Sequence, residues 1–187
     1  MLPDLGDIEE KVHQFVESLP CRFPEPYPEV MVAEPNAVYA QMLLDAFANG
    51  GAAELTAITQ YFHHSLVMEN QEVANLLLCI ALVEMLHLDL IGELIEQLGG
   101  DPRFWRANTA YWSGGNVAYG IEQNVGELLR LDIESEETAI DAYERLLHEI
   151  DDPGVQRVLM RIIRDEQVHL HLFQQALQKY CTLSNLE

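Results

Sequence analysis

From about residue 36 onward, apolar residues recur three and four positions apart, the period of helices that bury one face. The pattern predicts four long helices, over about 36–68, 71–98, 119–150 and 153–179. The glycine pair at 50–51 weakens the first, and the pair at 99–100 ends the second. Asp152 and Pro153 suit the N-cap and first residue of the fourth. Each helix is long enough to run the length of a bundle.

The connections between these helices differ in length. The first pair is joined near residues 69–70 and the second pair near 151–152, and such short links make antiparallel neighbours. Residues 101–120, between the second and third helices, are rich in glycine and aromatic residues and long enough to cross the bundle. The sequence therefore predicts an all-α four-helix bundle of two antiparallel hairpins joined by a long crossover.

The N-terminal part has a different composition. Residues 1–35 carry most of the prolines, which favour an extended arm, although residues 1–19 could form a short helix first. We therefore expect an arm over 1–35 and the bundle over 36–187.

The bundle sequence contains an internal repeat. Residues 54–95 and 136–177 align without a gap at an offset of 82, and 12 of the 42 positions are identical. Chance would give about one match in fifteen. ELTAITQY, from Glu54, and EETAIDAY, from Glu136, share Glu-x-x-Ala-Ile-x-x-Tyr. Each half is thus a hairpin with a glutamate on its first helix and a Glu-x-x-His motif 30 residues later.

The repeated acidic and histidine residues predict a site for two metal ions. Residues three apart share one helix face, and antiparallel packing brings the first-helix glutamate alongside the Glu-x-x-His motif. The expected ligands are Glu54, Glu84, His87, Glu136, Glu166 and His169. The repeat register selects Glu136 over Glu134 and Glu137. Two divalent cations would neutralise four buried carboxylates, and mixed oxygen and imidazole ligands suit Fe or Mn equally.

Further groups are expected around the metal ions. The imidazole nitrogens that do not bind metal need acceptors, such as carboxylates one helix away. Tyr61 and Tyr143, two turns after the repeated glutamates, are candidates to donate hydrogen bonds to ligand carboxylates or to act as redox-active phenols. The remaining histidines fit surface or polar core positions.

Net charge and cysteine content argue against several classes of function. The formal net charge of −21 argues against binding to nucleic acid or to anionic membranes. We find neither a signal peptide nor a membrane span in the pattern, and we expect a cytoplasmic protein. The three cysteines include no Cys-x-x-Cys pair, and Cys79 is expected to be a small core residue.

At these residues the sequence resembles the ferritin-like superfamily. The segment 54–62 is similar to the first ferroxidase helix of bacterioferritin. Bacterioferritin and rubrerythrin share an Arg-Asp-Glu-x-x-His pattern, which resembles Arg164-Asp165-Glu166-Gln167-Val168-His169. Residues 27–54 look more like the manganese catalases. The resemblance implies that the six residues bind metal. Under the manganese catalase pattern, Glu166 would instead assist proton transfer from outside the ligand set.

The resemblance implies an oxidoreductase that acts on hydrogen peroxide or dioxygen at two Fe or Mn ions. A catalase-like reaction needs no external reductant, whereas a peroxidase-like one needs a separate electron donor. A ferroxidase of the bacterioferritin type and a metal-stabilised structural or coat module are the alternatives. Proteins of this superfamily commonly form oligomers, so the resemblance implies a homodimer or a higher oligomer.

Overall fold

The computed structural model describes residues 8–104, 112 and 114–181, and all regular structure in these residues is helical. The elements are α1 (Ile8–Glu17), α2 (Ala37–Leu44), the π-helical turn η1 (Asp45–Asn49), α3 (Glu54–Val67), α4 (Gln71–Gln97), the 3-10 turn η2 (Gly114–Asn116), α5 (Val125–Glu149) and α6 (Pro153–Cys181). The expected all-α class is confirmed.

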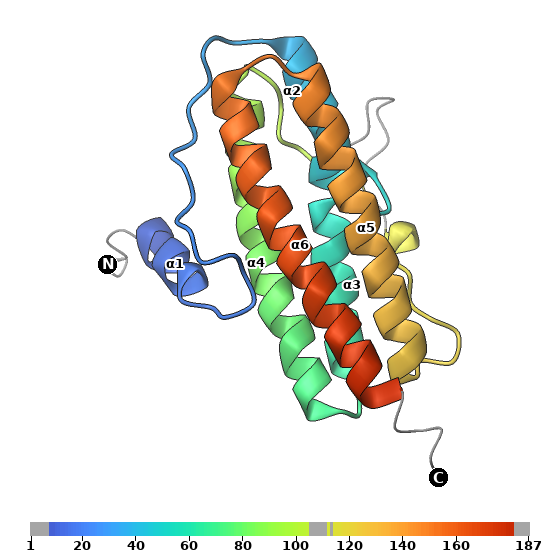
Figure 1. Cartoon of the computed structure of the whole chain (residues 1–187). Coiled ribbons are helices and arrows are strands. Elements are labelled where there is room, and N and C mark those ends of the chain that lie inside the picture. Colours follow the sequence, from blue (N-terminus) through green and yellow to red (C-terminus); the bar gives the residue numbers. More distant parts are fainter. Residues whose placement is uncertain (1–7, 105–111, 113, 182–187) are drawn as a thin grey trace, which may run out of the picture.

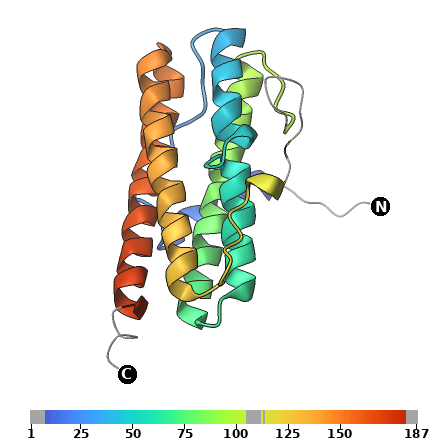
Figure 2. The same cartoon turned by 90° about the vertical axis from the view of Figure 1, so that its right-hand side faces the viewer.

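The helices α3 to α6 lie side by side as a four-helix bundle (Figure 1). α3 and α4 form one antiparallel hairpin, α5 and α6 form the other, and packing is closest within each hairpin. The connection between α4 and α5 leaves one end of the bundle and returns at the other (Figure 2). Residues 105–111 and 113 of this connection lie outside the described residues. The predicted topology of two hairpins and one crossover is confirmed.

The first predicted helix is interrupted at the glycine pair that was expected to weaken it. The backbone changes from α-helix to the turn η1 and then becomes extended at Gly50 before α3 begins at Glu54. One predicted helix boundary was wrong. The third helix begins at Val125 and not near residue 119. Gly120 and Gln123 have φ angles of +73° and +52°, which a right-handed helix cannot include. Asn124 then caps α5 by accepting a hydrogen bond from the Glu127 N–H.

Asp152 has the predicted capping role and a second role that the sequence did not indicate. One carboxylate oxygen accepts from the N–H groups of Gly154 and Val155, which caps α6. The other oxygen accepts from the N–H of Ala33, 2.8 Å away. Gly154 is needed at this place, because a Cβ there would lie 1.6 Å from the carbonyl oxygen of Met31. The N-terminal segment therefore packs tightly against the start of α6.

Cys79 is not the isolated core residue that the sequence suggested, because it forms a disulfide with Cys21. The two Cα atoms are 6.2 Å apart and the residues are 58 positions apart. Helical periodicity places Cys79 on a helix but cannot say which segment crosses it. Here the chain between α1 and α2 runs along the bundle beside α4 (Figure 1). Disulfides are rare in the reducing cytosol, and the cytoplasmic location stays a prediction.

α4 is long and apolar enough to cross a membrane by length and composition alone. Within the bundle, however, 56% of its most apolar window is buried. The buried face also carries the polar residues Glu84 and His87. The apolar composition of α4 is thus accounted for by its place in the bundle core, as in many soluble proteins.

Candidate metal centre

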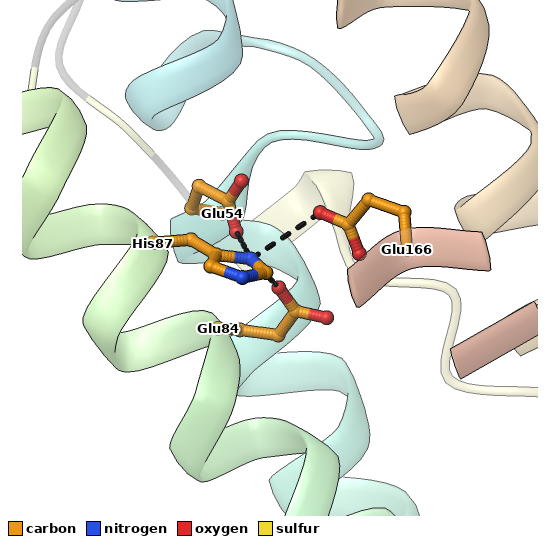
Figure 3. A group of neighbouring side chains, drawn as sticks. All are labelled: Glu54, Glu84, His87 and Glu166. Atoms are coloured by element: carbon orange, nitrogen blue, oxygen red, sulfur yellow. Dashed lines mark hydrogen bonds and ion pairs between the residues drawn. The ribbon is translucent and has the colours of Figure 1, made fainter. Parts of the chain in front are cut away.

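The six residues expected to bind metal are all buried and lie together at mid-bundle. Each is at most 3% exposed. α3 and α5 contribute one glutamate each, and α4 and α6 contribute one Glu-x-x-His motif each. They form two groups, and within each group the donor atoms lie within 4.8 Å of one another. The groups are Glu54, Glu84, His87 and Glu166, shown in Figure 3, and Glu84, Glu136, Glu166 and His169.

Glu84 and Glu166 belong to both groups because each lies between the two imidazoles. The carboxylate oxygens of Glu84 are 2.8 Å from Nδ1 of His87 and 2.9 Å from Nδ1 of His169. The corresponding distances for Glu166 are 3.3 and 3.0 Å. The two imidazole rings are 5.9 Å apart, centre to centre. This geometry suits two carboxylates that bridge a pair of ions.

Glu54 and Glu136 occupy outer positions. Each lies near one imidazole only, at 3.7 Å from Nδ1 of His87 and 3.8 Å from Nδ1 of His169, respectively. The repeated tyrosines cross over between the halves: Tyr61 donates a hydrogen bond of 2.7 Å to Glu136, and Tyr143 donates one to Glu54. Both phenols are buried. The predicted hydrogen bonds from tyrosine to carboxylate are therefore present in both halves.

Outside the six residues, a cluster around Asp165 holds His87. An oxygen of Asp165 is 3.0 Å from Nε2 of His87 (the nitrogen that faces away from the carboxylates). The same carboxylate accepts hydrogen bonds from the backbone N–H of Phe23 and the hydroxyl of Tyr27, and it pairs with Arg161 at 2.7 Å. Asp165 is thus the acceptor on a neighbouring helix that the sequence predicted without naming.

His169 has no such support in the described part of the chain. Its Nε2 is buried and has no hydrogen-bond partner there. The repeat shows why: subtracting 82 from Asp165 gives position 83, which is valine. The expectation that both imidazoles have an acceptor is therefore met on one side only. A comparison of the Arg-Asp-Glu-x-x-His segment with its repeat partner, in which valine replaces the aspartate, could have predicted this difference.

The neighbouring carboxylates favour the charged forms of both imidazoles. Burial alone would lower the pKa of His169, but the carboxylates of Glu84 and Glu166 raise it to about 10. The same two carboxylates raise the pKa of His87 well above its usual value against the effect of burial. Conversely, burial would raise the pKa of Glu84, yet the positive charges of His169 and His87 hold that pKa well below its usual range.

The outer carboxyl groups are shifted the other way. Burial, then the charge of Glu84, raises the pKa of Glu54 well above its usual value. Burial, then the charge of Glu166, does the same for the pKa of Glu136. Burial of so many carboxyl groups thus disfavours their negative charges unless cations lie beside them. Two divalent cations would balance four carboxylate charges, so the residues present fit a pair of such ions.

A second buried polar cluster lies outside the set of six residues. His64 is fully buried, with Nδ1 2.7 Å from Asp132 and Nε2 2.8 Å from the carbonyl oxygen of Ala118. Gln60 donates to Asp132 and accepts from the N–H of Ala118. This cluster ties the crossover to α3 and α5. His64 is thus one of the polar core histidines that the sequence predicted.

Comparison with known proteins agrees with this fold and site. The chain is 32% identical over 138 residues to the bacterioferritin of Desulfovibrio desulfuricans, covering 71% of this chain and 72% of the relative. It is 26% identical over 172 residues to a probable manganese catalase of Clostridium acetobutylicum, covering 81% and 75%. Among solved structures, a manganese catalase from Anabaena superposes with a TM-score of 0.76 at 28% identity, covering 84% of this chain and 78% of the other.

The X-ray structure of the Desulfovibrio desulfuricans bacterioferritin, described with a diiron site, superposes with a TM-score of 0.62 at 29% identity and covers 79% of this chain and 82% of the other. The sequence profile of the ferritin-like domain matches residues 47–182, which include both hairpins and all six clustered residues. With four bundled helices, a long crossover and paired Glu-x-x-His motifs, this chain belongs to the ferritin-like domain family.

Proposed function

We propose that this protein is a dimetal oxidoreductase that disproportionates hydrogen peroxide at a pair of manganese or iron ions. The observation that carries the proposal is the buried, paired arrangement of four carboxylates and two imidazoles. Glu54, Glu84, His87 and Glu166 would hold one ion. Glu84, Glu136, Glu166 and His169 would hold the other. Oxygen and imidazole donors without a thiolate suit Mn and Fe.

A bound metal pair would supply two-electron redox chemistry at one place, as conversion of two hydrogen peroxide molecules to two waters and one dioxygen needs. The chain would orient the ligands. Tyr61 donates to Glu136 and Tyr143 donates to Glu54, and each hydrogen bond fixes the orientation of an outer carboxylate. Both phenols also have pKa values raised well above 10, mainly by burial, and remain protonated donors at neutral pH. A further redox role of these phenols stays a prediction.

The position of Glu166 favours a bridging ligand over a proton-transfer group outside the ligand set. Its two oxygens face different imidazoles, as those of Glu84 do. The two roles predict different losses in a Glu166→Gln variant. A bridging ligand predicts fewer bound metal ions per chain, whereas a proton-transfer group predicts two bound ions and a slower reaction.

One observation and one chemical argument favour manganese and a catalase-like reaction. The manganese catalase from Anabaena superposes more closely than the bacterioferritin, with a TM-score of 0.76 against 0.62. Disproportionation also balances without an external electron donor. A peroxidase-like reaction would need a separate donor.

The test is oxygen evolution from added hydrogen peroxide by protein loaded with manganese or, separately, with iron. We expect rapid evolution from the manganese form and a loss of at least about 100-fold in Glu84→Gln, because that residue lies in both groups. Glu93→Gln, an exposed position on the same helix, is the matched control and should keep full activity. Equal rates for wild type and Glu84→Gln would refute the proposal.

Ferroxidase activity is the second candidate, favoured by the 32% identity to a bacterioferritin. It predicts rapid oxidation of added Fe(II) under air and little oxygen evolution from peroxide. A metal-stabilised structural or coat module predicts that two ions bind and that neither reaction occurs. The same metal-loaded preparations therefore separate all three functions.

Oligomerisation is a separate proposal. α3 exposes Phe62 and Leu66, and α4 exposes Leu78 and Met85. Large exposed apolar side chains on adjacent helices favour self-association. We expect a homodimer or a higher oligomer, which light scattering of the purified protein would measure.

A further inference from the structure

The two halves of the centre differ in what surrounds the imidazoles. The inner residues and both tyrosines repeat at the offset of 82, so the first coordination sphere is nearly symmetric. The residue behind each imidazole does not repeat: Asp165 in one half corresponds to Val83 in the other. Both positions are fully buried. At equivalent positions of the repeat, one half thus has a buried charged residue and the other a buried apolar one.

Asp165 is itself rigidly held. Four groups surround its carboxylate: Nε2 of His87, the N–H of Phe23, the hydroxyl of Tyr27 and the guanidinium of Arg161. Arg161 also binds the carbonyl oxygens of Phe23 and Glu25 and lies 4.1 Å from the centre of the Tyr27 ring. These contacts keep the carboxylate from turning away from the imidazole.

A carboxylate behind a metal-binding histidine has two effects. It keeps a hydrogen on the outer nitrogen, so the inner nitrogen presents its lone pair to the metal, and it makes the imidazole a stronger donor. His87 receives both effects from Asp165. For His169, no side chain in the described residues fixes which nitrogen carries the hydrogen. Its ligand geometry otherwise matches that of His87.

We propose that Asp165 is a positioning residue that makes the two metal positions unequal, so that the ion beside His87 binds first and tightly and the ion beside His169 binds second and more weakly. This inference rests on the proposed metal pair. Loss of a carboxylate behind a ligand histidine typically weakens metal binding by about 10- to 100-fold. The wild-type protein should therefore bind its two ions with dissociation constants that differ by about that factor.

The experiment is a calorimetric titration of metal-free protein with Mn²⁺, with Co²⁺ absorption as a second readout of ligand geometry. We expect two ions per chain in two resolved steps. Asp165→Asn should weaken the tighter step by about 10- to 100-fold and leave the weaker step unchanged. Val83→Asp should tighten the weaker step. Asp132→Asn is the matched control: a buried aspartate paired with a histidine outside the ligand set, whose loss should change neither step.

Tyr27→Phe covers the case in which Asp165→Asn fails to fold. It removes one hydrogen bond to Asp165 and keeps the ring beside Arg161, so it should weaken the same step by a smaller factor. Two ions bound with equal affinity in wild type, or both steps weakened equally by Asp165→Asn, would overturn the inference and leave the dimetal proposal standing. Fewer than two ions per chain would overturn both.

Discussion

The disulfide between Cys21 and Cys79 should be a major source of stability. It closes a loop of 58 residues between the N-terminal segment and α4. In the chain-entropy account, cross-links that close loops of 15 and 100 residues contribute about 3 and about 4.7 kcal/mol, so this one contributes about 4 kcal/mol. For a domain of this size, that corresponds to a fall in melting temperature of roughly 8–16 °C when the bond is absent.

The assay is urea unfolding of the wild type and of the double variant Cys21→Ser/Cys79→Ser, followed by circular dichroism. We expect the double variant to lose about 4 kcal/mol, and the wild type to lose a similar amount in reductant. Cys181→Ser is the matched control: Cys181 lies outside the disulfide, so this variant should keep the stability of wild type when no reductant is present. Unreduced, denatured wild type should contain one titratable thiol out of three cysteines.

Two results would refute this reasoning. One is three titratable thiols in the unreduced wild type, which would show that the bond is not formed. The other is a double variant within about 1 kcal/mol of wild type, which would show that the N-terminal segment is held by its other contacts. Those contacts include the hydrogen bonds of Phe23 and Tyr27 to Asp165.

Three further outcomes follow from the site and the packing. Against the effect of burial, neighbouring carboxylates raise the pKa of His169 to about 10, and burial with neighbouring charges raises the pKa values of Glu54 and Glu136, so the fold without metal loses stability as pH rises above about 6.5. Metal ions compete with protons for these residues, and the increase in melting temperature on adding Mn²⁺ should therefore grow from about pH 6 to about pH 8. An increase that does not depend on pH would contradict this. His64→Leu leaves the Asp132 carboxylate buried without its imidazole partner and should lower the free energy of unfolding in urea by about 3–5 kcal/mol. A loss below about 1 kcal/mol would show that the hydrogen bond from Gln60 is enough for this carboxylate. Gly154→Ala would place a Cβ 1.6 Å from a carbonyl oxygen and should lower the free energy of unfolding by about 3 kcal/mol or more. Gly51→Ala, where a Cβ would meet nothing within 4 Å, is the control and should change it by no more than about 0.5 kcal/mol. Equal effects of the two substitutions would contradict the packing at the start of α6.

The sequence by itself determined the bundle and the six clustered residues. Apolar periodicity and link lengths specify which helices are antiparallel neighbours, because a short link leaves a following helix no other place. The repeat specified which of several glutamates faces inward, since Glu136 has a partner in Glu54 and Glu134 and Glu137 have none. These are local or periodic properties, and the structure brings all six residues together as the repeat predicted.

Only the tertiary structure decided what lies around them. The proline-rich segment has no helical period to fix its path, so its crossing of α4 and α6 could not be foreseen. That path creates the disulfide to Cys79 and brings Tyr27 to Asp165. The interruption of the first helix at η1 and the late start of α5 likewise depend on backbone angles that composition only suggests. Contacts between segments distant in sequence are set by packing and burial, which no local pattern encodes.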